Sequence, residues 1–510
     1  MNAVAQQAGA SGISSRGLIT ISVMLASILQ TLDNTIANVA LPHIQGSLSA
    51  TQEQMGWVLT AYIVAAAIMT PLAGWLAGPL GRKKLFVISI AGFTLASALC
   101  GMAQTLSQLV IFRLIQGLAG ASLVPLSQAV LLDVYPREEQ GRATAMWAMG
   151  ITIGPILGPV LGGWLTEYYN WRWVFFINVP FGILAMIGVM TFVPESRNKF
   201  SPFDFFGFFA LSLAIGGLQI MLDRGQLLDW FSSPEIIAEA VVAGLAFYMF
   251  FVHSLTAKHP FVSLSLFADR NFSIGCVLMF VIGISLFATL ALLPPLLQNL
   301  LNYPVVTTGL VTAPRGVGAF ASMVLIGRLV GKIDARLLIS FGLGLTAFSM
   351  WGMTGFSPQM NSWPVIWTGF LQGLGMGFIY VPLAATAFAT LRLDLRNEGT
   401  SMFSLIRNIG SSIGIAVVAA LLTRNAQIMH SRLAEHVTPY DVATRAHFGF
   451  GEVTANGLAS LNGVVSQQAA MLAYNNDFQF LFVITLITMP LVLFLKVAKS
   501  GKAAPSVAVE

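Results

Sequence analysis

The chain has 510 residues, of which 56% are hydrophobic and only 9% are charged, and its formal net charge is +5. Soluble domains carry about 25% charged residues, so this composition excludes a soluble globular protein and indicates one that crosses a lipid bilayer many times. The basic residues lie in short loops between apolar segments, so the net charge does not indicate a nucleic-acid partner.

Apolar segments long enough to cross about 30 Å of hydrocarbon as a helix recur from one end of the chain to the other. The stretch VFFINVPFGILAMIGVMTFV (174–193), for example, contains no charged residue. We predict about fourteen membrane-spanning helices, in chain order 18–40, 54–78, 84–104, 107–133, 142–166, 173–193, 204–223, 235–255, 272–297, 305–330, 336–356, 362–390, 399–424 and 477–497. The expected fold class is therefore an all-α polytopic membrane protein.

An even number of spans places both termini on the same side of the membrane. One set of loops is rich in basic residues, such as Arg82 and Arg142, whereas the opposite loops hold few. The positive-inside rule then predicts that the N-terminal residues 1–17 and the tail 498–510 are cytoplasmic.

The second half of the chain repeats the first. Residues 114–146 resemble residues 370–402, with Gln-Gly-Leu and Val-Pro at matching places. Parallel repeats of six spans, with the substrate site between the halves, are the plan of one large class of transporters. We therefore expect an N-terminal six-helix bundle (18–198), two additional central helices (199–260) and a C-terminal six-helix bundle (261–497) that includes an outward-facing segment (425–476).

Four charged residues lie at membrane depth: Asp33, Arg113, Arg315 and Arg407. Inserting a charged side chain there costs at least about 2.5–3.5 kcal/mol of free energy, so each is expected to have a structural or functional role. Asp33 is expected to carry a proton, and the alternative is a structural ion pair that holds two helices together. Arg113 cannot deprotonate, so it either tunes a proton carrier or is structural, and its counterpart in the repeat is Gly369. Arg315 and Arg407 lie about two turns from predicted span edges and are expected to be structural.

The stretch GITIGPILGPVLGG (150–163) concentrates helix-breaking residues inside a span. Gly150, Gly154, Gly158 and Gly162 recur every four residues, so they form a stripe along which two helix backbones can approach closely. We predict that this stripe forms a seam against a helix of the C-terminal half and seals one end of a cavity. The prolines of the stretch are expected to bend the span. Its remaining members are Pro155, Pro159 and Gly163.

No constellation of residues indicates an enzyme. There is no Walker sequence, which argues against ATP drive within this chain. His430, His436 and His447 have no metal-binding spacing, so we expect no metal and no cofactor. Cys100 and Cys276 lie in apolar segments far apart, which argues against a disulfide framework.

Several of these stretches together resemble one family. LDNTIANVALP (32–42), RLIQGLAGA (113–121) and GPILGPVLGG (154–163) resemble the first-, fourth- and fifth-span motifs of the fourteen-span drug:proton antiporters of the major facilitator superfamily, close to the EmrB-type multidrug exporters. Asp33 falls on the acidic position of the first motif and Arg113 on the arginine of the second. WRWVFFINVP (171–180) and RNIGSSIGIA (407–416) are also similar to this branch.

The resemblance implies a major facilitator fold in which proton influx drives the export of amphipathic compounds by alternating access. It implies a multi-pass protein of the bacterial inner (cytoplasmic) membrane that is driven by the proton gradient and needs no cofactor. Gram-negative members work with a periplasmic adaptor protein and an outer-membrane channel, so the resemblance implies these partners as well.

The family's cytoplasmic loop motif after the second span is only partly present. The matching residues are Gly74, Gly81, Arg82 and Lys83. The motif's acidic residue and the arginine after it are replaced by Gly78 and Pro79, which puts in question the latch that the acidic residue forms between the halves. Arg82 is expected to pair with Asp133, as in similar family members.

The leading hypothesis is a proton-coupled exporter of lipophilic or amphipathic drugs, in which Asp33 loses its proton toward the cytoplasm and regains one from outside. Apolar area is expected to dominate the affinity of the substrate cavity. Its polar lining is expected to comprise Gln30, Asn34, Asn38, Tyr62, Gln116, Gln128 and Gln298.

Three alternatives remain. The first is a dedicated exporter of a single metabolite or siderophore with the same fold. The second is an uptake symporter, against which the fifth-span motif argues. The third, from a different class, is a sensor or a subunit that recruits an adaptor through 425–476, where 427–437 and 464–474 read as amphipathic helices.

Overall fold

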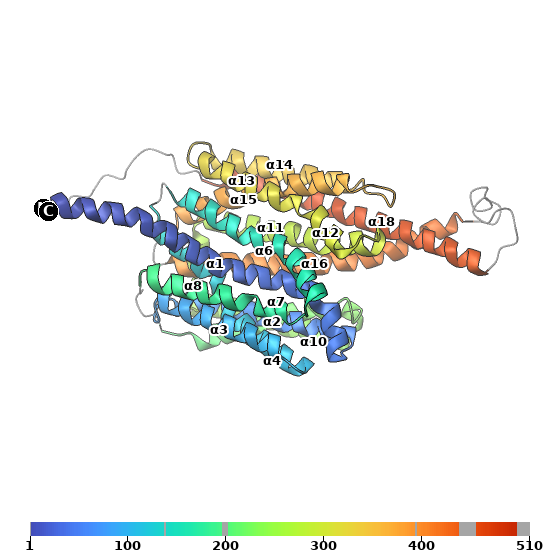
Figure 1. The fold of residues 1–510 in the computed structure, drawn as a ribbon, viewed down its shortest axis with the longest axis horizontal. Coiled ribbons are helices and arrows are strands. Elements are labelled where there is room, and N and C mark those ends of the chain that lie inside the picture. The colour runs from blue at the N-terminus through green and yellow to red at the C-terminus, as the bar shows by residue number, and fades with distance from the viewer. Residues whose placement is uncertain (1, 137–138, 196–201, 393–394, 438–454, 497–510) are drawn as a thin grey trace.

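A computed structural model describes residues 2–136, 139–195, 202–392, 395–437 and 455–496. They form a bundle of long helices whose axes run in roughly one direction (Figure 1). The long helices are α1 (Asn2–Leu48), α2 (Gln52–Leu76), α3 (Arg82–Met102), α4 (Leu106–Gly120), α5 (Leu123–Val134), α6 (Gln140–Tyr168), α8 (Asn178–Phe192), α9 (Phe205–Arg224), α10 (Pro234–Thr256), α11 (Arg270–Pro295), α12 (Val305–Thr312), α13 (Pro314–Leu329), α14 (Ala335–Met353), α15 (Trp363–Ala389), α16 (Arg396–Glu435) and α18 (Ala455–Thr488). Shorter elements are α7 (Trp173–Phe176), η1 (Trp230–Ser232), η2 (Leu264–Ala268), η3 (Leu296–Leu300) and η5 (Met489–Phe494).

The predicted spans coincide with these helices. Within the described residues, 13 helices are long and apolar enough to cross a membrane by length and composition, and two of them, α4 with α5 and α12 with α13, are broken once. The remaining predicted span, 142–166, is the 29-residue helix α6. The prediction of an all-α polytopic protein with about fourteen spans is therefore confirmed.

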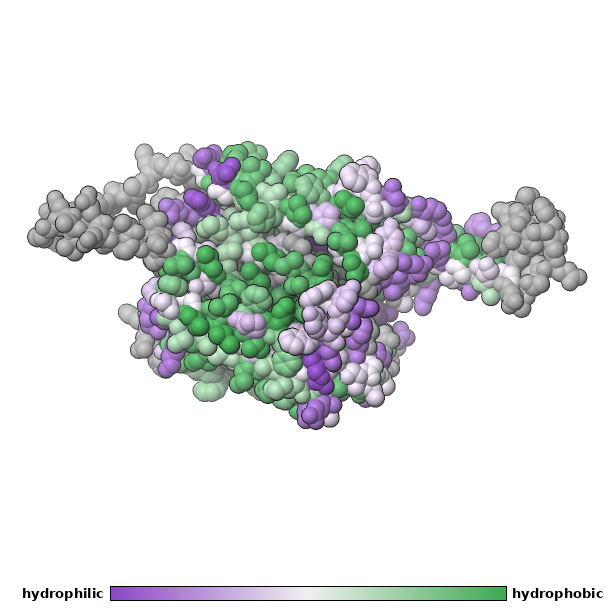
Figure 2. Space-filling view, in the orientation of Figure 1, coloured by the Kyte–Doolittle hydropathy of each residue, from purple (hydrophilic) through white to green (hydrophobic). Residues whose placement is uncertain are grey.

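The outer surface has the pattern of a protein embedded in lipid. On the face that Figure 2 shows, hydrophobic residues cover the middle of the molecule, and hydrophilic residues gather toward its two ends. Many large apolar side chains are exposed, among them Leu184 of α8, Phe209 of α9 and Tyr248 of α10. In water such a surface would drive aggregation, whereas in a bilayer it contacts acyl chains.

Equivalent helices pack in the same pairs in both halves of the chain. α1 packs against α6 as α11 packs against α16, and α2 packs against α4 as α13 packs against α15. α3 likewise contacts α8 as α14 contacts α18. α9 and α10 pack against each other, and α9 also contacts α2 and α16. The sequence repeat is therefore also a repeat of helix packing.

Two helices extend well beyond the bundle at one end of the molecule (Figure 1). α16 has 40 residues and α18 has 34, so they are about 60 and 50 Å long, compared with about 30 Å of hydrocarbon. Their projecting ends lie at the end of the molecule opposite to the start of α1 (Figure 1). Of the two stretches that read as amphipathic helices, 427–437 lies in α16 as far as Glu435. The stretch 464–474 lies wholly in α18, where Met471 and Tyr474 are already buried in the bundle. We call these projecting parts of α16 and α18 the hairpin.

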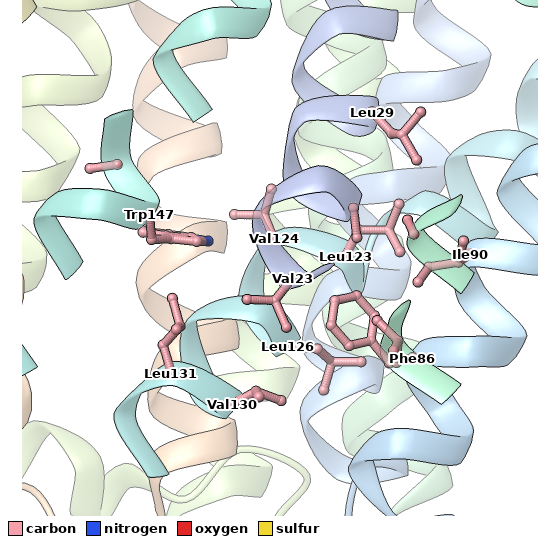
Figure 3. Close-up of a cluster of buried hydrophobic side chains, with 14 of the residues drawn as sticks. Val23, Leu29, Phe86, Ile90, Leu123, Val124, Leu126, Val130, Leu131 and Trp147 are labelled. Carbon is pink, nitrogen blue, oxygen red and sulfur yellow. The ribbon is translucent and has the colours of Figure 1, made fainter. Parts of the chain in front are cut away.

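A polar contact inside an apolar cluster joins three helices of the N-terminal half. Val23 of α1, Phe86 of α3, Leu126 of α5 and Trp147 of α6 are buried together (Figure 3). The indole N–H of Trp147 donates to the Ser127 hydroxyl at 2.7 Å, and this hydroxyl lies 2.6 Å from that of Ser27. The contact aligns α1, α5 and α6, and Asp33 lies further along α1.

Candidate functional site

Asp33 of α1 and Arg113 of α4 form an ion pair in the interior of the N-terminal half. Arg113 Nη1 lies 2.6 Å from Asp33 Oδ2, and the side chains of Asp33 and Arg113 are 0% and 1% exposed. The pair sits on the buried face of α1, where Leu29, Ile36 and Ala40 are also buried. Because water does not reach either charge, the attraction between them offsets the free-energy cost of burying each one.

Two amides complete the coordination of the Asp33 carboxylate. Gln116 Nε2 donates to Asp33 Oδ1 at 2.9 Å, and Asn178 Nδ2 donates to the same oxygen at 2.9 Å. Asn178 is also 3.0 Å from Ser97 Oγ, and Ser97 in turn donates to the Phe175 carbonyl at 2.8 Å. The carboxylate therefore receives donors from α4 and α8, which suits its ionised form.

Three further contacts hold the Arg113 guanidinium. Its Nε donates to the Val58 carbonyl of α2 at 3.2 Å, and its Nη1 donates to Gln116 Oε1 at 2.8 Å. The guanidinium carbon lies 4.3 Å from the centre of the Tyr62 ring. Four helices, α1, α2, α4 and α8, thus meet at this one pair.

This arrangement links the protonation of Asp33 to the position of Arg113. A proton on Asp33 would remove the negative charge and leave the Arg113 cation buried without a counter-charge. Breaking a buried pair by removing one partner typically costs about 3–5 kcal/mol, so the surrounding helices gain by rearranging. The site can therefore convert proton binding into a change of helix packing.

The C-terminal half lacks such a pair among its described residues. Gly369 occupies the repeat position of Arg113, and Gln372, the counterpart of Gln116, donates to the Thr289 hydroxyl of α11 at 3.1 Å. Arg315 Nη2 donates to the Leu286 carbonyl at 3.2 Å, so it links α13 to α11 inside the protein. Arg407 is half-buried in α16, where its Nη2 lies 3.4 Å from Asn408 Oδ1.

The glycine stripe of α6 packs inside its own half, so the prediction of a seam with the C-terminal half is wrong. A Cβ on Gly150 would lie 2.8 Å from Met24 Cε, and one on Gly154 would lie 2.7 Å from the Leu32 nitrogen. Gly158 faces Thr35, and Gly162 faces Ile36 and Val39, all on α1. Spacing along a helix identifies the small face but not the neighbour that it meets. Gly163 is half-buried, and the side chains of Pro155 and Pro159 lie outside the described part.

α6 also contacts the C-terminal half, through a different face. Thr152 Oγ1 lies 3.9 Å from Met323 Sδ of α13, and Trp147 lies 6.1 Å, ring centre to ring centre, from Tyr380 of α15. α6 therefore connects the Asp33-bearing helix to the C-terminal half.

The residues expected to line a substrate cavity fall into two groups. Tyr62, Gln116, Gln128 and Gln30 are buried in the N-terminal half, and Gln30 accepts the Val124 N–H at 3.2 Å. Asn34 and Asn38 are exposed on an adjoining face of α1, and Gln298 is half-buried in η3. A small cavity lies elsewhere, in the C-terminal half, where mostly apolar side chains line it together with Ser285, Thr346, Gln372, Thr485 and Thr488. The structure thus brings together the Asp33 network but not the whole expected cavity set.

A polar latch joins the two halves at the end of the molecule opposite to the hairpin. Arg82, at the start of α3, forms an ion pair with Asp133 of α5 and donates from Nε to Asn397 Oδ1 of α16 at 2.7 Å. Arg396 Nη1 lies 3.5 Å from Asp133 Oδ1 and donates to the Leu132 carbonyl at 2.9 Å. The two halves are therefore closed against each other here.

The loop motif shapes the backbone around this latch. Gly81 has a φ of 82°, a conformation open to glycine and strained for other residues, and it leads directly into Arg82. Gly74 faces Ser401 of α16, since a Cβ there would lie 2.9 Å from Ser401 Oγ. Gly78 and Pro79 lie in the turn after α2, and Lys83 is half-buried. The expected ion pair between Arg82 and Asp133 is therefore present, although Gly78 replaces the acidic residue of the motif.

Comparison with known proteins identifies the family. The model of the Major Facilitator Superfamily matches residues 23–415 of this chain. The chain belongs to the major facilitator superfamily. This superfamily comprises membrane transporters, so the chain is a multi-pass membrane transporter and not an enzyme.

Individual relatives place the chain within the superfamily. It is 38% identical over 480 residues to the fatty acid resistance protein FarB of Neisseria gonorrhoeae, covering 93% of this chain and 95% of FarB. It is 36% identical over 486 residues to the multidrug export protein EmrB of Escherichia coli (strain K12), covering 94% of this chain and 95% of EmrB. It is therefore a member of the EmrB- and FarB-like multidrug efflux family.

A solved structure supports the fold alone. The crystal structure of the human organic anion transporter MFSD10 (TETRAN) matches with a TM-score of 0.59 at 15% identity, covering 92% of this chain and 99% of that chain. A major facilitator fold is thus shared despite this low identity.

Sequence reasoning on this family member missed several residues that take part in the site and the latch. Asn178 lies in the stretch WRWVFFINVP, and an amide within an apolar span was the available signal. Arg396 and Asn397 lie in a predicted loop, and nothing local shows that they meet Arg82. Asp477 stands at the predicted edge of the last span, but the structure buries it completely.

Proposed function

We propose that the protein is a proton-driven exporter of lipophilic or amphipathic compounds that works by alternating access. The observation that carries this proposal is the buried Asp33–Arg113 pair, which exists in the N-terminal half and has Gly369 in its place in the other. An intramembrane acid that pairs with a fixed cation is a typical proton carrier.

In this mechanism Asp33 alternates between ion pair and neutral acid. In the ionised form it holds Arg113, Gln116 and Asn178 around it, as observed. A proton from outside would neutralise the carboxylate, release Arg113 and shift α1 relative to α4. Because α1 also packs along the glycine stripe of α6, this shift would reach the contacts between α6 and the C-terminal half. Substrate and proton need only differ in their affinity for the two conformations.

The relatives support the export of amphipathic compounds. One is named a multidrug export protein and another a fatty acid resistance protein, and both match along almost their whole length. Broad specificity agrees with a cavity in which apolar area dominates affinity. A dedicated exporter of a single metabolite or siderophore is the second candidate, which transport of one compound but not of chemically different ones would favour.

The proposal includes a location and an orientation. We place the protein in the bacterial inner membrane, with both termini and the Arg82 latch in the cytoplasm, because the basic loops lie at that end. We divide it into two bundles, 18–198 and 261–497, with the additional helices in 199–260 between them. The hairpin would then reach into the periplasm, where a periplasmic adaptor and, through it, an outer-membrane channel are the proposed partners.

Proton release on substrate binding tests this function. The purified protein in nanodiscs, in weakly buffered solution with a pH dye, receives a lipophilic drug or a long-chain fatty acid. The wild type is expected to release protons, and Asp33→Asn is expected to release none. Asp229→Asn is the matched control, because Asp229 is exposed and has a φ of 56°, which Asn tolerates. Undiminished release from Asp33→Asn would rule out Asp33 as the carrier.

A further inference from the structure

A second intramembrane carboxyl group differs sharply from Asp33. Asp477 of α18 is 0% exposed, and neither of its carboxylate oxygens accepts a hydrogen bond from any described residue. It also forms no ion pair with a described cation, whereas Asp33 has Arg113 and two amide donors. Nothing in the Asp33 mechanism uses Asp477.

The surroundings of Asp477 are apolar. α18 packs against α16, α14, α11, η3 and η5. Tyr474, Phe478 and Leu481 of the same helix belong to one buried apolar cluster, together with Met353 of α14 and Val418 of α16. The Tyr474 hydroxyl, one turn away on α18 itself, is close enough to interact electrostatically with Asp477. Among the described residues, none donates a hydrogen bond to this carboxyl group.

Charged groups on the adjoining helices are distant. The hydrogen bond between His430 and Asn462, at 3.0 Å, joins α16 and α18 side by side. Counting residues from this bond along the two antiparallel helices puts Asp477 at about the level of Ile415. Arg407 and Arg424 of α16 lie more than two turns from that level, about 12–14 Å along the axis. Arg336 of α14, and Arg270 and Cys276 of α11, lie toward the opposite ends of their helices, and η3 and η5 contain no titratable residue.

These observations decide the form of the carboxyl group. An ionised carboxylate without donors or a cation in an apolar interior is far more costly than a neutral acid, so the group binds a proton instead. We propose that Asp477 is a second proton-binding site, located in the C-terminal half and loaded with a proton in this conformation.

Two residues close to Asp477 in sequence, Asn475 and Phe478, hold Phe356 in place, and we call Phe356 the lid. Asn475 Nδ2 donates to the Phe356 carbonyl at 3.0 Å, and the Phe478 ring packs edge-on against the Phe356 ring, with centres 5.7 Å apart. Phe356 is 3% exposed and lies just beyond the end of α14, at the end of the bundle from which the hairpin projects. Phe356 packs on the face of α18 that carries Asn475 and Phe478, which is about 130° around the helix from Asp477. Its release would therefore act on Asp477 by loosening α14 from α18 and admitting water between these helices, so that the proton passes to water and the carboxylate becomes hydrated. Proton exchange at Asp477 would then accompany opening of the connection between α14 and α15.

The role of Asp477 in transport rests on the proposed function. If Asp33 exchanges one proton in the N-terminal half, Asp477 provides a second, which exchanges at the hairpin end. Proton binding at Asp477 itself does not depend on the role of Asp33, so the two ideas fail independently.

Infrared difference spectroscopy of the purified full-length protein at neutral pH tests the site directly. The wild-type minus Asp477→Asn spectrum is expected to show the carbonyl stretch of one protonated carboxylic acid. Asp33→Asn is the matched control and is expected to keep that band. A difference spectrum with carboxylate bands in place of the acid band would overturn the proposal, and would indicate a bound cation instead of a proton.

A second measurement tests the lid. Phe356→Ala is expected to hydrate the site, so that the acid band disappears at neutral pH and reappears on acidification. Because this variant also loses packing, its thermal unfolding is compared with that of Phe356→Ala/Asp477→Asn, which is expected to be more stable than Phe356→Ala at neutral pH. Retention of the acid band in Phe356→Ala, or equal stability of these two variants, would contradict the lid.

The pH dependence of unfolding provides a third measurement. The folded wild type holds a proton on Asp477 that the unfolded chain releases at neutral pH, so its stability should fall as pH rises. Asp477→Asn is expected to lose this part of the fall. An identical pH dependence in both proteins would overturn the proposal.

Discussion

Gly154 of α6 lies directly against Thr31 of α1, within the N-terminal half. The next turn repeats the contact, because Thr35 Oγ1 donates to the Gly154 carbonyl at 3.2 Å. Thr31 and Thr35 flank Asp33 in sequence. The glycine stripe therefore fixes the helix that carries the proposed proton carrier, and it seals no boundary between the halves.

Gly154→Leu should separate α1 from α6. The added side chain would collide with the backbone of Leu32, so we expect a loss of about 1–3 kcal/mol in stability and a loss of export. Gly244→Leu on α10 is the control, because a Cβ at Gly244 meets nothing within 4 Å. Thermal unfolding and drug efflux measure both effects, and normal efflux by Gly154→Leu would refute this role of the stripe.

Removing one partner of the ion pair should cost more than removing both. Arg113→Gln leaves Asp33 buried without a counter-charge, so we expect a destabilisation of about 3–5 kcal/mol. Asp33→Asn/Arg113→Gln should recover a large part of it, because neither charge remains. A double-mutant cycle on the purified protein measures this coupling, and additive effects of the two single changes would show that the pair is not coupled.

Arg82→Ala should impair export while leaving the amount of protein in the membrane unchanged. The change removes the contacts of Arg82 with Asp133 and Asn397, so the latch can no longer close the two halves together. We expect efflux to fall by about tenfold, which corresponds to about 1.4 kcal/mol. Lys84→Ala is the control, because Lys84 is exposed two residues away. Wild-type efflux by Arg82→Ala would remove the latch from the mechanism.

The hairpin should crosslink to a periplasmic adaptor. Photoreactive residues at Leu458 and Val464 of α18, which are 53% and 44% exposed, are expected to capture a co-expressed adaptor. The same probe at Leu245 of α10, which is 58% exposed, is expected to capture none because it faces lipid. Equal capture from α18 and α10 would contradict a docking role for the hairpin.

Local properties made much of this protein predictable from the sequence. Hydropathy over twenty residues reports membrane insertion segment by segment, so the spans could be placed before any contact was known. The cost of a buried charge singled out Asp33 and Arg113 in the same way, because it depends on the residue and its depth. The four-residue spacing of Gly150 to Gly162 likewise revealed a small helix face.

The partners of these residues depended on the tertiary structure. The cost of burying Asp33 requires a partner but does not name one, and packing of α1, α4 and α8 supplied Arg113, Gln116 and Asn178. The glycine face contacts α1 and not a helix of the other half. Its periodicity could not predict this, because spacing along one helix carries no information about the neighbouring helix. Asp477 is the converse case: a residue at a predicted span edge is a buried acid without a hydrogen-bond donor among the described residues, because its helix packs between α11, α14 and α16. Burial and pairing are properties of helices brought together over long sequence distances, and only the folded arrangement determines them.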